Sequence, residues 1–283
     1  MTHAKKVKSG TADLIVSIIL DVLIVVFTLL IVIPLIWMMI SSFKGTNEIF
    51  SNIWGFPESW RVSNYTTAWN TGISKYFLNS VIVCISTIIL NLVVCSLMAF
   101  TLSINKFKLE KLFAGIAVIG MMFSPIVAIF PLYQEIQTLG LYNNLLSLIL
   151  IYTAYQIPMS FMVIYAFFKS IDKAYIDAAR IDGATDLKIL FNVFIPLSAS
   201  IFMVSVVLTG FYAWNEFTFA LVFIKNDVLK TIPVGLLAFQ GEMYSDWGVL
   251  LAGLTISALP IIALFIFAQK YFVAGLSMGG VKG

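Results

Sequence analysis

The longest polar run between two apolar stretches of this sequence spans residues 171–196, and its charges are spaced to act on one helical surface. Acidic and basic residues are interleaved in it: Asp172, Lys173, Asp177, Arg180, Asp182, Asp186 and Lys188. Lys173 and Asp177 stand four residues apart, and Asp177 and Arg180 three, which are the spacings at which side chains of one helix meet. The chemistry that this pattern offers is charge-mediated recognition of a partner.

The same run is predicted to fold as a helix, a glycine turn and a second helix. Gly183 can end the first helix in a left-handed turn, and Thr185 or Asp186 can cap the next. The pair Ala178–Ala179 leaves a bare patch beside the charges. A short charged helix with a small-residue face suits docking into a groove of another protein.

Further polar and aromatic residues occur inside apolar stretches, where contact with lipid would penalise them. Seven of them are candidates for lining a solute pathway: Asn91, Tyr152, Tyr155, Gln156, Trp214, Asn215 and Glu216. Tyrosines and an amide can hold a polyol by stacking and hydrogen bonding. Hydrogen bonding between packed helices uses the same residue types, so both interpretations stay open.

Asn91 is also the last member of a polar stripe. Ser80, Cys84, Thr87 and Asn91 follow the helical positions i, i+4, i+7 and i+11, which lie on one face of a helix. This face is predicted to meet protein or a water-filled path rather than lipid.

The residues that most catalytic and metal sites need are missing. The only histidine is His3, and the sequence has no Ser–His or Cys–His pair and no set of His, Cys and acidic residues at metal-ligand spacing. The glycine-rich phosphate loop of ATP-binding proteins is absent as well. We therefore predict no catalytic residue, no metal site and no cofactor bound by this chain. A nucleic-acid partner is not expected either, because there is no basic stripe.

Composition places these residues in a membrane protein. The 283 residues are 60% hydrophobic and 11% charged, with a mean hydropathy of +1.00, which exceeds what a soluble core can bury. A helix needs about 20 apolar residues to cross the hydrocarbon layer. Six such stretches predict an all-α integral membrane protein of one domain: residues 14–40, 77–102, 112–132, 145–168, 197–224 and 249–272. Pro125 and Pro131 predict a kink in the third.

The distribution of positive charge predicts the orientation of these spans. Twelve of the 17 Lys and Arg residues fall on the side that holds the N-terminus, and the other side holds only Lys44, Arg61, Lys75, Lys225 and Lys230. Because positive residues are enriched on the cytoplasmic side, we expect both termini and residues 171–196 to lie in the cytoplasm.

Residues 177–184, Asp-Ala-Ala-Arg-Ile-Asp-Gly-Ala, resemble the EAA loop of the membrane subunits of binding-protein-dependent ABC importers. The likeness covers nearly the whole chain and is greatest to the carbohydrate branch, the type represented by the smaller maltose permease subunit. Matching segments outside the loop are Ser42–Lys44, Asn64–Tyr65, Asn79–Ser80, Trp214–Glu216, Pro233–Gly235, Asp246–Gly248, Pro260, Gly275–Leu276 and Gly279–Gly283. Asp177 stands where the family usually has Glu, and Asp172 where it usually has Pro. Asp177 keeps the negative charge of Glu, and Asp172 can cap the start of the helix.

The resemblance implies the type I importer fold, with six transmembrane helices, in a prokaryotic plasma membrane. It implies three kinds of partner: a homologous second permease subunit in a heterodimer, two cytoplasmic ATPase subunits that carry ATP and Mg²⁺, and an extracellular or periplasmic sugar-binding protein. The implied coupling helix comprises Asp177, Ala178, Ala179, Arg180, Asp182, Gly183 and Ala184. The tail residues Gly279, Gly280 and Lys282 are implied to lie at the ATPase interface, and residues 225–248 to contact the binding protein.

The expected function is that of a permease subunit in an ATP-driven importer of a sugar, in the first place an oligosaccharide. One alternative is an importer of another solute, such as a glycerol phosphate, an amino acid or a peptide. Another is a self-contained carrier or a membrane enzyme. Asp21 and Glu216 are the only acids placed within the predicted spans, which argues against an ion-coupled carrier.

Overall fold

The computed structural model describes residues 11–104, 110–239 and 246–279, and these residues form helices joined by turns, with no strand among them. Four helical segments are long and apolar enough to cross a membrane: Leu14–Ser41, Ser63–Ile104, Leu145–Ser170 and Trp247–Lys270. Two bent helix pairs supply the remaining spans, Glu110–Met121 with Pro125–Thr138 and Asp186–Leu197 with Ala199–Asn215. The prediction of an all-helical membrane protein is confirmed for the described residues, and the number of spans reaches the predicted six when each bent pair counts as one span.

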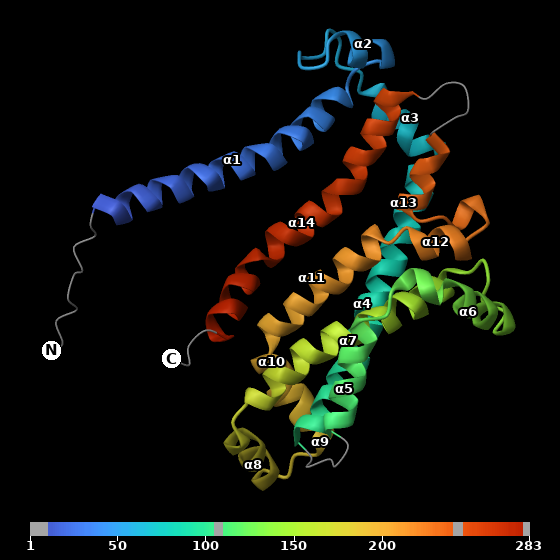
Figure 1. Ribbon diagram of the computed structural model, residues 1–283. Helices are drawn as coiled ribbons and strands as arrows, with labels where there is room; N and C mark the ends of the chain where they lie inside the picture. The colour runs from blue at the N-terminus through green and yellow to red at the C-terminus, as the bar shows by residue number, and fades with distance from the viewer. Residues whose placement is uncertain (1–10, 105–109, 240–245, 280–283) are drawn as a thin grey trace.

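The chain order of the elements fixes their names in Figure 1. The first half contains α1 (Thr11–Ser41), α2 (Thr46–Ser51), α3 (Ser63–Ala68), the π-helical turn η1 (Trp69–Ile73), α4 (Ser74–Ile104), α5 (Glu110–Met121) and α6 (Pro125–Thr138). The second half contains α7 (Leu145–Ser170), α8 (Lys173–Ile181), α9 (Asp186–Ile189), η2 (Leu190–Phe194), α10 (Ile195–Leu197), α11 (Ala199–Asn215), α12 (Thr218–Phe223), η3 (Asp227–Leu229), α13 (Ile232–Gly235), η4 (Leu236–Phe239) and α14 (Trp247–Gly279).

The third and fifth spans differ in shape from the straight helices that their hydropathy suggests. Helix α5 ends at Met121, and α6 begins at Pro125 after a bend of 104°. Proline is favoured in the first turn of a helix, where its missing N–H costs nothing, so the predicted kink becomes a full break. The fifth span, predicted over residues 197–224, ends already at Asn215, and α12 follows as a separate short helix.

Helices α4, α7 and α11 pack against one another and form the centre of the bundle. Two hydrophobic clusters lie along it. One contains Tyr76, Tyr152, Trp214 and Phe219, and the other contains Phe100, Phe168, Ile176 and Phe194. The second cluster joins the central helices to the polar segment that follows α7.

Helix α1 leaves the bundle along most of its length (Figure 1). It contacts α14, yet none of its most apolar window is buried. A helix that is apolar on every side and unburied within its own chain has its partners in lipid or in another subunit.

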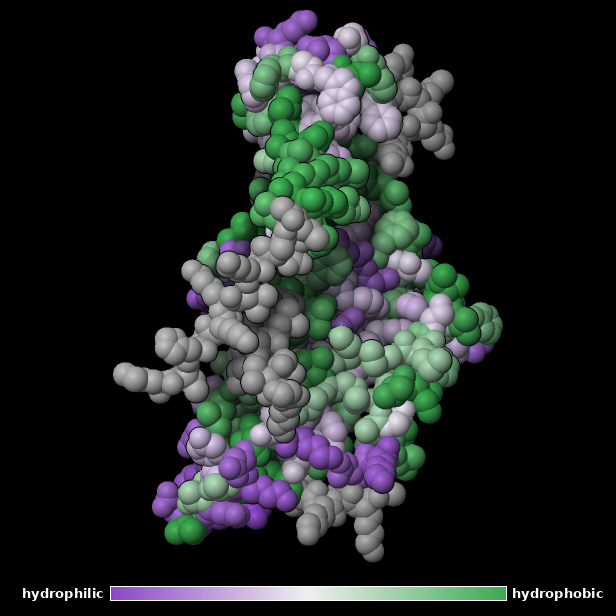
Figure 2. All heavy atoms as spheres, turned by 60° about the vertical axis from the view of Figure 1, so that its left-hand side comes forward, coloured by the Kyte–Doolittle hydropathy of each residue, from purple (hydrophilic) through white to green (hydrophobic). Residues whose placement is uncertain are grey.

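Hydrophilic side chains gather at the two ends of the molecule, with a hydrophobic zone between them (Figure 2). One end carries α8 and α9, and the opposite end carries α2 (Figure 1). We call these the α8 end and the α2 end. Both termini of the described chain, Thr11 of α1 and Gly279 of α14, point away from the α2 end, as an even number of spans requires.

Candidate docking and pathway sites

Helix α8 is bounded at both ends by local hydrogen bonds that its sequence encodes. The Asp172 carboxylate accepts from the N–H of Ala174 at 3.0 Å and caps the first turn. At the other end Gly183 has a φ of +74°, and two backbone bonds close the turn: Gly183 N–H to Arg180 O and Ala184 N–H to Ala179 O. This is a Schellman ending with glycine in the left-handed position. The predicted order of helix, glycine turn and helix is confirmed.

The charges of α8 are not arranged as their spacing suggests. Neither Lys173–Asp177 nor Asp177–Arg180 forms an ion pair; within the described ranges Arg180 pairs with Asp186 at the start of α9, at 3.4 Å. The chain turns back on itself at Gly183, and this turn brings Asp186 within reach of Arg180. The Asp177 carboxylate is exposed and engages no basic side chain among the described residues.

Apolar side chains lie exposed beside these charges. Tyr175 and Leu187 are exposed, and Ile181 shows 86% of its surface. Tyr175 and Ile181 share α8 with the exposed Asp177 and Ala178, and Leu187 lies on α9, so the α8 end presents apolar and acidic groups together. The sequence prediction considered only the charges and alanines of this run and missed these three residues. Their large apolar side chains within a polar run were the available signal.

Ile176 anchors α8 to the bundle. It is buried together with Ile189 and Leu190, which follow on α9 and η2. Phe194 continues this contact, with ring centroids 4.9 Å from Phe168 of α7 and 5.0 Å from Phe100 of α4. Helix α8 therefore packs on buried apolar side chains that contact two of the three central helices, α4 and α7.

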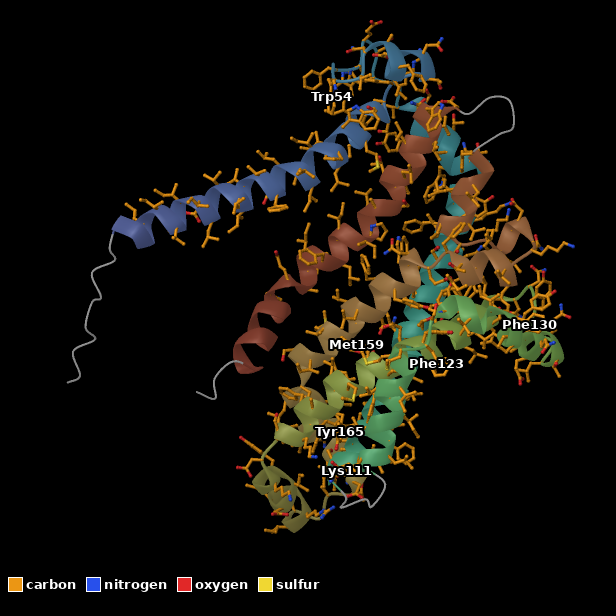
Figure 3. All side chains as sticks on the ribbon, viewed as in Figure 1. Trp54, Lys111, Phe123, Phe130, Met159 and Tyr165 are labelled. Atoms are coloured by element: carbon orange, nitrogen blue, oxygen red, sulfur yellow. The ribbon has the colours of Figure 1, made fainter. Side chains whose placement is uncertain are left out.

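A polar clamp lies where α7 approaches α8. Lys169 Nζ is 2.5 Å from Glu110 Oε1, the Tyr165 hydroxyl donates to the same carboxylate, and Lys169 lies over the Tyr165 ring. Figure 3 places Tyr165 near this end of the molecule, with Lys111 close by. The clamp ties the first residue of α5 to the last turn of α7, so these helices are held together just before α8 begins.

Glu216 holds the break between α11 and α12. Its carboxylate accepts from the N–H groups of Phe219 and Ala220 at 2.8 and 3.1 Å, and from the Tyr152 hydroxyl at 2.6 Å. The acid thereby satisfies the free N–H groups of a new helix start, and Tyr152, fully buried, connects it to α7. For Tyr152 and Glu216 the structure favours hydrogen bonding between packed helices over the lining of a solute pathway.

Trp214 and Asn215 lie beside Glu216 in different surroundings. The Trp214 indole is buried and donates to Ser257 O of α14 at 3.0 Å. Asn215 is exposed, and both residues line a mainly apolar cavity of about 470 Å³ between α1, α11, α13 and α14. Of this pair, Trp214 is buried and Asn215 is exposed.

Tyr155 and Gln156 on α7 are half-buried, whereas Asn91 on α4 is fully buried. The Tyr155 ring lies 5.1 Å from that of Phe219 on α12. Four of the seven candidates, Tyr155, Gln156, Asn215 and Glu216, therefore keep exposed surface, and of these the Glu216 carboxylate already accepts three hydrogen bonds. The structure does not bring Asn91 to that surface.

The segment after α12 is fastened to α4 at the α2 end. The Asn79 amide donates to Val228 O and Lys230 O at 2.8 and 2.9 Å, and the Tyr76 hydroxyl donates to Asp227 at 2.9 Å. Lys230 pairs with Asp227 at 2.8 Å, and the hydrogen bonds from Lys230 and Tyr76 hold the pKa of that carboxyl below its usual range. The first part of the predicted contact segment 225–248 is thus a fixed surface, and residues 240–245 lie outside the described residues.

A buried lysine organises the rest of the α2 end. Lys44 is fully buried, and its ammonium donates to Asn52 O at 2.6 Å, at the C-terminal end of α2, where a positive charge is favoured. Trp54, at this end in Figure 3, and Phe56 remain largely exposed. Their exposure suits either the membrane interface or a protein contact.

The remaining predictions concern the tail, metals and cysteines. Gly279 is the last residue of α14, and Gly280 and Lys282 lie outside the described residues. In the part of the chain that the structure describes, no three His, Cys, Asp or Glu residues are grouped to hold a metal. Cys84 and Cys95 are free and buried.

Broken apolar spans around a packed centre, with a polar, exposed helix at one end, are the features of a multi-pass membrane protein. Residues 91–278 match the family of binding-protein-dependent transport system inner membrane components, and the chain belongs to this family.

Among relatives, the probable ABC transporter permease protein YurM of Bacillus subtilis is 47% identical over 250 residues, covering 88% of this chain and 83% of YurM. The diacetylchitobiose uptake system permease protein NgcG of Streptomyces coelicolor is 31% identical, in an alignment that covers 91% of this chain and 86% of NgcG. A chain from the crystal structure of a bacterial ABC transporter that imports the polysaccharide alginate has the same fold, with a TM-score of 0.83 at 23% identity over 94% of this chain and 100% of that one.

Proposed function

We propose that this chain is a membrane subunit of an ATP-driven carbohydrate importer, in which it forms half of the translocation pathway and is moved by a separate ATPase. The observation that carries the proposal is α8. It is an exposed helix with acidic and apolar side chains, capped at both ends and seated through Ile176 on the central helices. A force applied to such a helix reaches α4 and α7 through packed side chains.

The chain offers no residues of its own to use ATP. It lacks the phosphate-binding glycine loop, and no catalytic constellation occurs in its sequence. We infer that the chain is not an enzyme and that ATP and Mg²⁺ bind to the partner ATPase. Two ATPase copies would face the α8 ends of two permease subunits, and the tail from Gly279 to Gly283 would lie beside them.

We assign an oligosaccharide as the solute. Relatives with 31% identity are named for diacetylchitobiose uptake and for melibiose, raffinose and stachyose import, and each covers about nine-tenths of this chain. Tyr155, Gln156 and Asn215 provide the stacking surface and amides that a sugar hydroxyl array requires. A glycerol phosphate would need a basic group on this surface. None of the three candidates is basic, so the sugar is favoured over that alternative.

The exposed surface of α1 supports a second permease subunit as partner. The helix is apolar on all sides and unburied within its own chain, and a homologous subunit would cover part of it. The fastened segment at the α2 end, residues 225–232, offers the extracellular binding protein a rigid contact. With α8 in the cytoplasm, this arrangement belongs in a prokaryotic plasma membrane.

Uptake into membrane vesicles tests the proposal. The chain is reconstituted with its companion permease and binding protein, and entry of a labelled oligosaccharide is measured with and without the ATPase and ATP. We expect uptake only in the complete system. Uptake driven by this chain without the ATPase would overturn the proposal. ATP-driven uptake of amino acids or peptides, but of no sugar, would overturn the assignment of an oligosaccharide as the solute.

A further inference from the structure

The centre of the bundle contains a polar core that includes Asn91 but none of the other six pathway candidates. It lies where α4, α7 and α11 meet and consists of six residues with 6% exposure or less: Thr87, Asn91, Cys95, Ser160, Ser205 and Thr209. Thr87 and Asn91 also belong to the stripe of Ser80, Cys84, Thr87 and Asn91 on α4, and Cys95 follows one turn later on the same helix. Polar groups inside a membrane bundle need hydrogen-bond partners, because the surrounding hydrocarbon supplies none.

Part of this core is satisfied by a directed chain of hydrogen bonds. The Asn91 Oδ1 atom can only accept, so the Thr209 hydroxyl, 3.4 Å away, donates to it. Thr209 has then used its single proton, and the Ser160 hydroxyl at 3.3 Å donates to Thr209. The Cys95 thiol also reaches Asn91 Oδ1, at 3.8 Å.

Three atoms of the core have no partner among the described residues: Thr87 Oγ1, Asn91 Nδ2 and Ser205 Oγ. All three residues are completely buried. Exchanging the amide oxygen and nitrogen of Asn91 would turn an unpartnered donor into an unpartnered acceptor, so the deficit does not depend on that assignment.

The three atoms follow one another along the contact between α4 and α11. These helices run in opposite directions, and the Thr209–Asn91 hydrogen bond sets their relative position. Thr87 lies one turn, about 6 Å, from Asn91 toward the α2 end, and Ser205 lies one turn from Thr209 toward the α8 end. Asn91 therefore lies between the two unpartnered hydroxyls.

We propose that Thr87, Asn91 and Ser205 hold one or more internal water molecules in the centre of this subunit. Water is the ligand that fits, because it both donates and accepts and needs two to four polar partners. An amide and two hydroxyls supply that number. None of the three residues has exposed surface, so the site lies inside the subunit.

The sign of a stability change distinguishes a hydrated core from a dry one. Thr87→Val keeps the side-chain shape and removes the hydroxyl. In a dry core this relieves a buried unpartnered atom and raises the apparent melting temperature of the assembled transporter, whereas in a hydrated core it deprives the water of a partner. We expect a fall of about 2 to 4 °C. Thr255→Val is the matched control, because the equally buried Thr255 hydroxyl already donates to Leu251 O at 2.8 Å.

Radiolytic labelling in ¹⁸O water supplies an independent measurement on the same protein. Cys95 has no exposed surface, so hydroxyl radicals reach its sulfur only from water inside the bundle. We expect heavy oxygen at Cys95 in the wild type and in Thr255→Val, with a loss of severalfold in Asn91→Leu. An unchanged or raised melting temperature for Thr87→Val, or an unlabelled Cys95 in the wild type, would overturn the proposal.

Discussion

At the scale of single residues, Glu216 shows how an acid is kept within an apolar bundle. A carboxylate facing lipid at mid-membrane costs about 2 to 3.5 kcal/mol, but Glu216 accepts three hydrogen bonds, two of them from the start of α12. The residue therefore serves as the cap that makes the break after Asn215 possible. This role also explains the burial of Tyr152, which has no access to solute but reaches the same carboxylate.

We predict that Tyr152→Phe lowers the free energy of unfolding by about 1.5 to 3 kcal/mol, because the half-buried Glu216 carboxylate loses one charged hydrogen bond from a fully buried donor. The apparent melting temperature measures this change, and Tyr155→Phe on the same helix is the control. Tyr155 is half-exposed, so its loss of the hydroxyl should reduce sugar uptake and hardly change stability. If Tyr152→Phe costs as much in a Glu216→Ala background as in the wild type, the two residues are not coupled.

Individual residues also mark the limit of sequence reasoning. Gly183, Asp172 and the stripe ending at Asn91 behave as their types and spacing predict, because capping and helical periodicity are local. The Arg180–Asp186 pair and the role of Glu216 depend on where the chain turns back, which spacing along one helix does not contain. Four of the seven pathway candidates, Asn91, Tyr152, Trp214 and Glu216, form hydrogen bonds within the bundle. The sequence could not separate them from the other three, because helix packing and solute pathways use the same polar residue types.

At the scale of elements, the turn between α8 and α9 determines how the docking helix is presented. A Cβ atom at Gly183 would meet nothing within 4 Å, so any effect of a side chain there comes from the backbone and not from crowding. Asn tolerates the left-handed conformation, whereas Pro fixes φ near −65° and removes the N–H that bonds to Arg180 O.

Gly183→Pro should therefore abolish ATP-driven uptake while the protein still inserts into the membrane. Gly183→Asn should retain most of the activity, because the turn is preserved. Uptake assays at equal amounts of membrane-inserted protein, measured by immunoblot, give the comparison. Normal uptake by Gly183→Pro would show that the α8–α9 turn does not transmit motion.

The segment after α12 is an element whose attachment depends on pH. The Asp227 pKa is lowered by Lys230 first and by Tyr76 second, so the folded carboxyl holds its proton less strongly than the unfolded one. Its contribution to stability is present above the unfolded pKa of about 3.9 and is lost as the pH falls through the lower folded value. The Asp227 side chain is 64% exposed, so solvent screening keeps this contribution under about 1 kcal/mol.

Asp227→Asn should lower the apparent melting temperature slightly at pH 7 and not at all at a pH below the folded pKa. Melting curves of wild type and variant across this range measure the difference. A difference that is the same at every pH would show that the loss comes from shape and not from charge.

The bent spans show why element boundaries are harder to predict than elements. Hydropathy marks six apolar stretches correctly, but it cannot distinguish one continuous helix from two that meet at an angle. Pro125 begins the helix after the break at residues 122–124, and the capping carboxylate of Glu216 marks the end of the fifth span after Asn215, whereas the 81° bend of that span lies at Ser198. Only the first of these was visible as a breaker in the sequence.

At the scale of the whole molecule, the two polar ends have different characters. The α2 end is fixed by hydrogen bonds from buried Lys44, Asn64 and Asn79 to backbone carbonyls. The α8 end rests on apolar packing and shows exposed apolar side chains to solvent. In our account the first end receives a solute carrier and the second receives the motor, with the central helices α4, α7 and α11 between them.

Photo-cross-linking from α8 tests this account most directly. The photoreactive amino acid p-benzoylphenylalanine replaces Ile181, which is 86% exposed at the α8 end, or in the control Phe130, which is 70% exposed on α6 away from that end (Figure 3). After irradiation of native membranes we expect a product between this chain and the ATPase subunit from position 181 and none from position 130. A product with the extracellular binding protein from position 181, or ATPase products from position 130 alone, would contradict the account.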